Sequence, residues 1–233
     1  KENALKCSRE VCDILHQNNV ELYVDKKYYE QFKDKNHVNF GIFKDFVKES
    51  DIAIAIGGDG TILKCARYLL GLDTKLLGIN TGRLGFMASL EFDELDEMER
   101  LIKGDYDIIK RMMLDTRIHT GEEYCENIAL NDVSVARVYS KLCDFSVYVD
   151  DELIGSYRAD GVVISTPTGS TAYALSAGGP IIEPDLDCIE MTLICPHSLF
   201  SRPMLFSPER VIKLVHNVET KPDQMTIPEL LTA

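Results

Sequence analysis

The feature that most constrains the fold is an unbroken apolar run, Ile52 to Ile56, which ends abruptly in Gly57 and Gly58. Strands of a parallel sheet are covered on both faces, so they read as continuous apolar runs rather than alternating ones. Helical spacing of apolar residues resumes from Ile62 to Leu70, and Lys75 to Ile79 reads as a second buried strand. Strand, helix and strand in this order predict an α/β unit with a parallel sheet.

The rest of the first hundred residues fits the same class. Apolar spacing predicts an amphipathic helix over residues 2–16, a short strand over 20–24, a helix over 40–47 and a charged helix over 93–102. We therefore predict an α/β domain over residues 1–104, which carries the Gly-Gly-Asp-Gly-Thr loop.

The pattern of predicted elements changes after residue 104. Short β-rich runs follow one another, and Asp150-Asp151 stands between two of them as a candidate hairpin turn. One helix is predicted to start near Thr168. We predict a mostly β domain over residues 105–233, with strands in the runs 108–118, 128–138, 143–149, 153–157, 162–165, 191–194 and 211–215.

Charge and composition exclude several classes of function. The net charge of −13 argues against nucleic acid as a partner, because binding a phosphate backbone needs clustered Lys and Arg. No apolar stretch approaches membrane-spanning length, and the first residues do not read as a signal peptide. The seven cysteines include no C-x-x-C pair, so we expect reduced thiols, no zinc and a cytoplasmic protein.

The strongest local motif is Gly57-Gly-Asp-Gly-Thr61, between the buried strand and the following helix. Glycines let the backbone approach phosphate oxygens, and the helix N-terminus offers free N–H groups to the same place. A carboxylate among them would repel phosphate unless it meets Mg²⁺ or takes a proton from an attacking hydroxyl. The alternative is a tight turn in which Asp59 caps the helix.

A second motif, Asn80-Thr-Gly-Arg-Leu-Gly-Phe86, also follows a buried strand. Loops at the carboxyl ends of parallel strands lie side by side, where ligands bind. Gly82 and Gly85 permit close approach, and Phe86 offers a face on which a base can stack. The alternative is that Phe86 belongs to the core and the glycines only turn the chain.

Two further motifs lie in the second half. Asn131-Asp132 can hold a ribose or an adenine edge through directed hydrogen bonds, although a β-turn explains such a pair equally well. A predicted strand then runs into Thr166-Pro-Thr-Gly-Ser-Thr-Ala-Tyr173, whose hydroxyls and N–H groups could meet phosphates and sugar oxygens. Asp160, just before that strand, could accept from an amide or a ribose hydroxyl. Helix capping is the alternative for the Ser and Thr residues.

The order of these blocks, with Pro196-His-Ser-Leu199 and Arg202-Pro203 after them, resembles the NAD kinase family, in its bacterial ATP/polyphosphate type. The resemblance spans roughly residues 51 to 214. It implies an N-terminal α/β domain and a β-rich C-terminal domain with NAD between them. The implied activity is transfer of a phosphoryl group to the 2′-hydroxyl of the adenosine ribose of NAD, which makes NADP.

The resemblance also implies roles for single residues. Asp59 would be the catalytic residue beside the 2′-hydroxyl, in a donor phosphate loop of Gly57, Gly58, Gly60 and Thr61. The implied NAD-binding residues are Gly60, Phe86, Asn131, Asp132, Asp160, Thr171, Ala172 and Tyr173. Phe86 would lie against the adenine and Asp160 would meet the nicotinamide end.

The resemblance further implies Mg²⁺ or another divalent metal that arrives with ATP rather than a permanent metal site in the protein. It implies a homodimer or homotetramer with shared sites, and no nucleic acid or membrane partner. A domain of this family should begin with a strand, whereas this sequence opens in a helix, so we expect residues to be missing there. The polar stretch 216–233 does not read as the β-rich close of such a domain.

Other functions remain open on the sequence alone. Diacylglycerol and sphingosine kinases look similar around Asp59, but the Thr166–Tyr173 block is not expected in them, and phosphofructokinases carry a related glycine motif in longer chains. An NAD(P)-binding sensor without turnover is a third reading, although it would have little reason to keep the Asp59 carboxylate.

Overall fold

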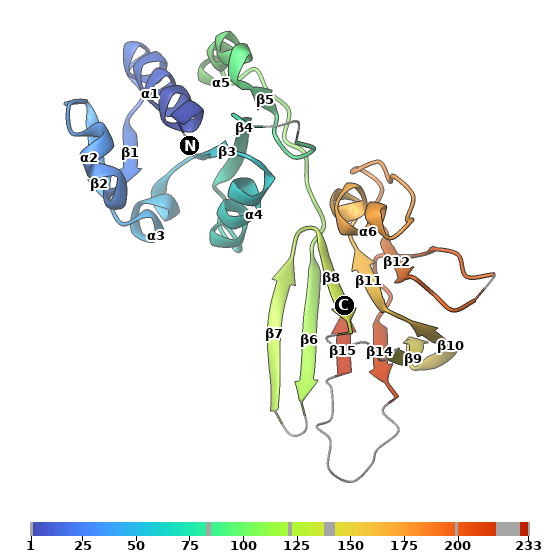
Figure 1. Cartoon of the computed structure of the whole chain (residues 1–233). Coiled ribbons are helices and arrows are strands. Elements are labelled where there is room, and N and C mark those ends of the chain that lie inside the picture. Colours follow the sequence, from blue (N-terminus) through green and yellow to red (C-terminus); the bar gives the residue numbers. More distant parts are fainter. Residues whose placement is uncertain are drawn as a thin grey trace. The chain divides into compact units, whose positions relative to one another are not determined.

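The computed structural model describes residues 2–82, 85–120, 123–137, 143–198, 200–217 and 229–232. The chain forms two compact units, Lys1–Ile108 and Ile109–Ala233, which are drawn in Figure 1. The first unit alternates helices with parallel strands, and the second is built mainly of antiparallel strands. Both fold classes predicted from the sequence are confirmed.

The first unit contains two small parallel sheets, ordered β1-β2 and β3-β4-β5. Its elements are α1 (Glu2–Gln17), β1 (Leu22–Asp25), η1 (Lys26–Tyr28), α2 (Tyr29–Phe32), β2 (Val38–Gly41), α3 (Phe43–Phe46), η2 (Val47–Glu49), β3 (Ile52–Gly57), α4 (Asp59–Tyr68), β4 (Lys75–Asn80), β5 (Leu90–Glu91), η3 (Phe92–Glu97) and α5 (Met98–Lys103).

Close packing of α4 on β4 brings the start of this helix to the carboxyl end of the sheet. A β-carbon added at Gly78 would lie 2.6 Å from the Ile62 side chain, so the helix can approach only because this position has no side chain. On α1, the apolar positions Cys7, Val11 and Leu15 are buried in one cluster with Ile79 and Met98. This burial is what the apolar stripe of residues 2–16 predicted.

The predicted helix over residues 40–47 is wrong in its first part. Val38–Gly41 is a strand that pairs with β1, and the helix begins only at Phe43. Phe40 packs in a cluster with Val38, at the two-residue spacing of a strand, whereas Phe43 and Phe46 pack in a different cluster. Phe40, Phe43, Phe46 and Val47 therefore have the spacing of one apolar helix face, although Phe40 packs in one cluster and the other three in another. The short elements β5 and α2 were not predicted.

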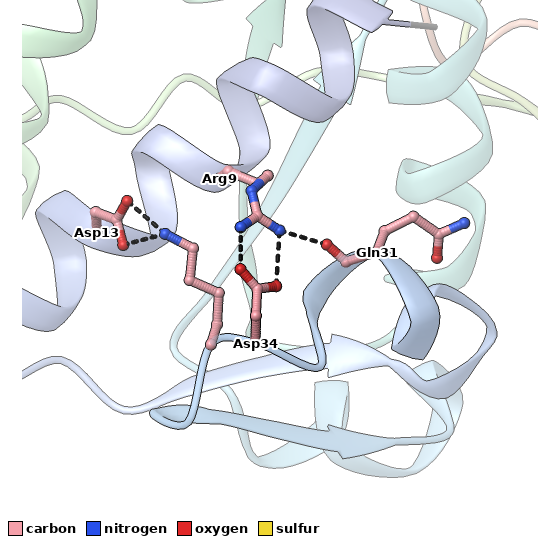
Figure 2. A network of polar contacts seen from close by, with 5 residues as sticks. Arg9, Asp13, Gln31 and Asp34 are labelled. Atoms are coloured by element: carbon pink, nitrogen blue, oxygen red, sulfur yellow. Dashed lines mark hydrogen bonds and ion pairs between the residues drawn. The ribbon is translucent and has the colours of Figure 1, made fainter.

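A polar network joins α1 to α2 and to the segment that follows it (Figure 2). The guanidinium of Arg9 donates to the Gln31 carbonyl at 2.6 Å and to both carboxylate oxygens of Asp34, and the Lys35 ammonium pairs with Asp13. Arg9 lowers the pKa of the Asp34 carboxyl to about 2. Because the Arg9–Asp34 pair is largely exposed, its main effect is to set the orientation of the segment rather than to add much stability.

The second unit has two antiparallel sheets, ordered β10-β9-β14-β15-β6-β7 and β13-β12-β11-β8. Buried residues of both sheets, such as Phe145, Val147, Ile164 and Met191, share one core. The elements are β6 (Leu114–Thr120), β7 (Glu123–Ala129), β8 (Asp132–Ala136), β9 (Cys143–Val149), β10 (Glu152–Ala159), β11 (Gly161–Ser165), η4 (Thr168–Thr171), α6 (Tyr173–Ser176), β12 (Ile189–Ile194), β13 (Met204–Phe206), β14 (Ile212–His216) and β15 (Glu229–Thr232).

The predicted hairpin between β9 and β10 is confirmed. Asp150 and Asp151 have φ values of 50° and 67°, and two successive positive φ angles are those of the type I′ turn that matches strand twist. Aspartate tolerates this conformation better than most side chains, which explains why the pair occurs at this turn.

Four predictions for the second unit need correction. The run 108–118 forms a strand only from Leu114, and the run 128–138 contains the end of β7, a turn and β8 rather than one strand. The predicted helix near Thr168 is a single 3₁₀ turn followed by the four-residue α6. The tail does contribute to the sheet, since β15 pairs with β14 and β6, while residues 218–228 of that stretch lie outside the described residues.

All seven cysteines are within the described residues and are free thiols. Burial raises the pKa of Cys7, Cys12 and Cys65 to about 11 each, whereas Cys125 on β7 and Cys195 after β12 are exposed. In the described part of the chain, no helix is long and apolar enough to cross a membrane.

Candidate functional site

The Gly57–Thr61 loop leads from β3 into α4 at the carboxyl end of the parallel sheet, opposite Asn80 at the end of β4. A β-carbon at Gly57 would lie 2.4 Å from the Thr61 hydroxyl, so the turn requires glycine there. At Gly58 and Gly60, by contrast, a β-carbon would meet no described atom within 4 Å. The backbone of these two glycines therefore borders open space that a ligand could occupy.

The N-terminus of α4 is not capped by a side chain of its own. Its N-cap residue is Gly58, whose carbonyl accepts from the Thr61 N–H at 2.8 Å. The interpretation of Asp59 as the helix cap is therefore wrong, because Asp59 is the first residue inside the helix and its side chain bonds elsewhere. Free N–H groups and the positive end of the ten-residue helix face the loop, which favours an anion there.

The carboxylate of Asp59 joins the two predicted glycine motifs of the first unit. One oxygen accepts from the Phe86 N–H at 3.2 Å and the other from the Met87 N–H at 3.3 Å. A β-carbon at Gly85 would lie 2.5 Å from the Asp59 carboxylate, so this close approach depends on glycine at position 85. Each carboxylate oxygen keeps a lone pair beyond these bonds, so Asp59 can still accept from a hydroxyl.

The loop after β4 presents Phe86 to solvent and is anchored by Asn80. The Phe86 side chain is 63% exposed, so the alternative that it belongs to the core is wrong. Asn80 is buried, donates to the carboxylate of Glu91 at 2.9 Å and accepts from the Gly82 N–H at 3.1 Å. Sequence reasoning missed Glu91, because its link to Asn80 depends on the pairing of β4 with the unpredicted β5. Arg83 and Leu84 of this motif lie outside the described residues.

In the second unit, the main chain of Asn131 is the anchor of the Thr166–Tyr173 segment. Its carbonyl accepts from the Thr166 N–H at 2.8 Å, and the Thr166 hydroxyl donates to the Leu130 carbonyl at 2.6 Å. A β-carbon at Gly169 would lie 2.1 Å from the Asn131 carbonyl oxygen. The segment and the Asn131-Asp132 turn are therefore packed directly against each other.

Most hydroxyls of this segment are used inside the protein. Ser165, Thr166 and Ser170 are completely buried. The Ser170 hydroxyl donates to the Pro167 carbonyl at 2.7 Å and accepts from the Ile182 N–H at 3.0 Å. These three side chains shape the turn. Thr168, Thr171 and Ala172 are half-buried and Tyr173 is exposed, so a ligand could reach this part of the segment.

The side chains of Asn131 and Asp132 differ in their bonding. The Asn131 amide oxygen is shielded from solvent and has no hydrogen-bond partner among the described residues. Such an acceptor costs about 1–3 kcal/mol unless a donor reaches it, so it fits an amino group or a hydroxyl of a ligand. Asp132 accepts from the Tyr173 N–H at the start of α6, but burial has the larger effect and raises the pKa of its carboxyl.

Asp160 lies between β10 and β11 and forms an ion pair with Arg137, with Nη2 and Oδ2 3.0 Å apart. The Arg137 N–H also donates to the Asp160 carbonyl at 2.9 Å. Sequence reasoning missed Arg137. The sequence shows only one cation directly after the end of β8, and its pairing with Asp160 follows only from the register of β8 on β11.

The register separates Asp160 from the Asn131-Asp132 turn. Asp132 pairs with Ser165 at one end of β8 and β11, and Ala136 pairs with Gly161 at the other. Four residue steps of strand correspond to about 13 Å. The second unit thus offers one polar group of residues at each end of this strand pair.

A buried carboxyl, Glu190 on β12, was also missed. It is completely buried, one oxygen accepts from the Thr192 hydroxyl at 2.7 Å, and the other has no partner among the described residues. Burial raises the pKa of this carboxyl. A β-carbon at Gly179 would lie 1.9 Å from Glu190, so the carboxyl packs against the glycine turn that follows α6.

A parallel α/β unit with a glycine-rich loop, followed by a unit of two antiparallel sheets, defines the class of this protein. Comparison with family models narrows the class: the ATP-NAD kinase N-terminal domain matches residues 1–106, and the ATP-NAD kinase C-terminal domain matches residues 130–227. The chain belongs to the NAD kinase family. The lipid kinase and phosphofructokinase readings are thereby excluded.

Individual relatives agree with this assignment. The chain is 45% identical over 174 residues to the NAD kinase of Acetivibrio thermocellus, a match that covers 73% of this chain and 60% of the relative. It is 37% identical over 222 residues to the NAD kinase of Thermoanaerobacter sp. strain X514, covering 92% of this chain and 76% of the relative. The chain thus spans less than two thirds of the length of the first of these relatives.

Solved structures show the same fold. Yeast NADH kinase complexed with NADH superposes with a TM-score of 0.88 at 27% identity, covering all of this chain and 76% of the yeast chain. An NAD kinase from Archaeoglobus fulgidus in complex with ATP gives a TM-score of 0.66 at 26% identity, over 91% of this chain and 88% of the other.

Proposed function

We propose that the chain transfers a phosphoryl group from ATP to the 2′-hydroxyl of the adenosine ribose of NAD and so makes NADP. The observation that carries this proposal is the Asp59 carboxylate, held at the N-terminus of α4 between two glycines that border open space. The names of the relatives support ATP and NAD as substrates.

The Gly57–Thr61 loop is the proposed binding site for the donor phosphates. Its glycine backbone can approach phosphate oxygens closely, and the N-terminus of α4 favours their negative charge. Among the described residues, no group of three His, Cys, Asp or Glu side chains could hold a metal ion. We propose that Mg²⁺ arrives with ATP, and when bound it neutralises charge on the phosphates.

Asp59 is the proposed catalytic residue. Its two bonds to the N–H groups of Phe86 and Met87 fix the carboxylate, so it is already oriented when the ribose arrives. The 2′-hydroxyl oxygen attacks the terminal phosphorus, the bond from that phosphorus to the departing ADP oxygen breaks, and the hydroxyl proton passes to Asp59. The products are NADP and ADP, with the proton released afterwards.

The NAD-binding residues are proposed from both units. In the first unit, the exposed ring of Phe86 offers a stacking surface for adenine, and the Gly60 backbone borders open space. In the second, the unpartnered amide oxygen of Asn131 can accept from the adenosine portion. Asp132, Thr171, Ala172 and Tyr173 line the same end of the β8–β11 pair, and Asp160 is proposed to meet the nicotinamide amide.

We further propose a cytoplasmic homodimer or homotetramer with shared sites. Free thiols at all seven cysteines support a reducing compartment. The separation of Asp160 from the Asn131-Asp132 turn supports sharing, since the two ends of one strand pair could contact dinucleotides in different subunits.

The test is to incubate the chain with NAD, ATP and Mg²⁺ and to follow NADP with an NADP-specific dehydrogenase. Formation of NADP only when all three are present is the expected result, and replacing ATP by polyphosphate then defines the donor range. A folded protein that binds NAD but makes no NADP would overturn the proposal in favour of a sensor.

A further inference from the structure

The ion pair between Arg137 and Asp160 bears on a property that the proposed function leaves open, namely which redox form of the dinucleotide is phosphorylated. We propose that Arg137 is a specificity-determining residue, which neutralises Asp160 and thereby reduces the preference of the site for oxidised over reduced nicotinamide. This inference rests on the proposed function and on the placement of Asp160 at the nicotinamide end.

The geometry holds the Asp160 carboxylate in one place. Arg137 contacts residue 160 twice, through the ion pair at 3.0 Å and through its main-chain N–H. The Asp160 N–H donates to the Ile194 carbonyl at 2.9 Å. The next residue, Gly161, packs so tightly that a β-carbon would lie 2.5 Å from the Val135 carbonyl oxygen. The main chain at residue 160, between β10 and β11, is therefore held by contacts to both β8 and β12, and these contacts fix the position of the ion pair.

The pair is partly shielded from solvent, so the charges of its members are felt by whatever binds beside it. The side chains of Arg137 and Asp160 are 37% and 23% exposed. Burial has the largest effect on the pKa of the neighbouring Cys143 thiol and raises it, while Arg137 lowers this pKa and both Asp160 and Asp144 raise it.

The two redox forms differ in charge at the ring that would face this pair. Oxidised nicotinamide carries a positive charge and reduced nicotinamide is neutral, while both carry the same carboxamide. An unpaired carboxylate would attract the oxidised ring more strongly. A carboxylate paired with Arg137 still accepts a hydrogen bond from the carboxamide, but it exerts little net field on the ring.

The test measures kcat/KM for NAD⁺ and for NADH and takes their ratio. Arg137→Met removes the positive charge beside Asp160 and should raise the NAD⁺/NADH ratio at least about five-fold, the size expected of one unit charge about 4 Å away in bulk water. Asp160→Asn removes the negative charge of the pair while Arg137 keeps its positive charge, and it should shift the ratio in the opposite direction. Arg137→Lys keeps a cation beside Asp160 and should keep the wild-type ratio. The double variant Arg137→Met/Asp160→Asn removes both charges and should also have the wild-type ratio.

Arg117→Met is the matched control. Arg117 pairs with Glu126 at 3.1 Å on neighbouring strands of the same unit, with both side chains 54% exposed. Its loss should leave the ratio unchanged. A general loss of activity in Arg137→Met with an unchanged ratio would show a purely structural role and overturn the inference while the proposed function stands.

A wild-type chain that phosphorylates neither form would overturn the proposed function instead. The inference is then tested by calorimetric titration of the same variants with NAD⁺ and NADH. An unchanged ratio of the two dissociation constants, or the absence of binding of both forms, would overturn it as well.

Discussion

The Gly57–Thr61 loop of the first unit and the Thr166–Tyr173 segment of the second are built alike. Each follows a strand of its unit's sheet, is rich in small residues and leads into a helix. They differ in where their polar groups are directed. In the first, Gly58 and Gly60 border open space, whereas in the second, Gly169 is pressed against the Asn131 carbonyl and the hydroxyls of Thr166 and Ser170 are buried.

This difference separates two uses of the same composition. A glycine with nothing beside it leaves room for a ligand, while a glycine in contact with another main chain makes room for the protein itself. We infer that the first loop binds the donor phosphates and that the second segment is a rigid support whose end, from Thr171 to Tyr173, meets the ligand.

The largest expected effect is that of Asp59→Asn. It should reduce kcat for NADP formation by about a thousand-fold, because a positioned general base contributes roughly 10²- to 10⁴-fold. Calorimetry should show NAD binding retained. The control is Asp73→Asn, an exposed aspartate of the same unit, and equal rates in the two variants would remove Asp59 from the mechanism.

The next prediction compares two glycine-to-alanine changes. Gly169→Ala should lower the free energy of unfolding by about 3 kcal/mol, because the new methyl group would overlap the Asn131 carbonyl. Gly60→Ala should cost no stability, since its methyl group meets open space in a helix, but it should raise KM for ATP. Urea unfolding and steady-state kinetics measure both. Similar stability losses in the two variants would break the comparison.

Hydroxyl deletions sharpen the same contrast at a smaller scale. Ser170→Ala removes the partner of the buried Ile182 N–H and should lower the unfolding free energy by about 1–3 kcal/mol, with KM for NAD unchanged. Thr61→Ala, at an exposed position of the donor loop, should leave the unfolding midpoint nearly unchanged and raise KM for ATP. The inverse pattern would mean that the two segments have exchanged roles.

The smallest effect concerns Glu190, the buried carboxyl beneath the second segment. Its pKa is raised in the folded state, so the folded chain holds the proton more tightly than the unfolded chain does. Stability from this group is therefore present below its ordinary pKa and declines as the pH rises from there through the folded-state pKa. The stability of Glu190→Gln relative to the wild type should therefore increase as the pH rises from 5 to 8. Parallel stability curves for the two proteins would contradict this.

Sequence reasoning succeeded where a local pattern carries the information. The continuous apolar run before Gly57 predicted a parallel strand, and the Asp150-Asp151 pair predicted a hairpin, because each depends on neighbouring residues alone. It failed where distant parts of the chain decide. Phe40 was assigned to a helix because its spacing to Phe43 fits one. It lies instead in β2, which forms by pairing with β1, and β1 lies earlier in the sequence.

The candidate site divides in the same way. That Asp59 is placed between glycines could be predicted, but its bonds to the N–H groups of residues 86 and 87 depend on the contact between two loops. The internal use of the Thr166 and Ser170 hydroxyls depends on partners at Leu130 and Ile182. The pairing of Arg137 with Asp160 could not be predicted either, because it depends on the register of β8 on β11.

Because the cysteines differ in burial, the chain has two exposed thiols, Cys125 and Cys195, to which a reagent can be attached. Only a deprotonated, accessible sulfur reacts with alkylating reagents, so the buried thiols with a raised pKa, such as Cys7 and Cys12, are protected near neutral pH. Cys125 and Cys195 are exposed and both lie in the second unit. Maleimide dyes should therefore label the β-rich unit of the unmodified chain, so its motions could be followed by fluorescence without first removing the other five cysteines.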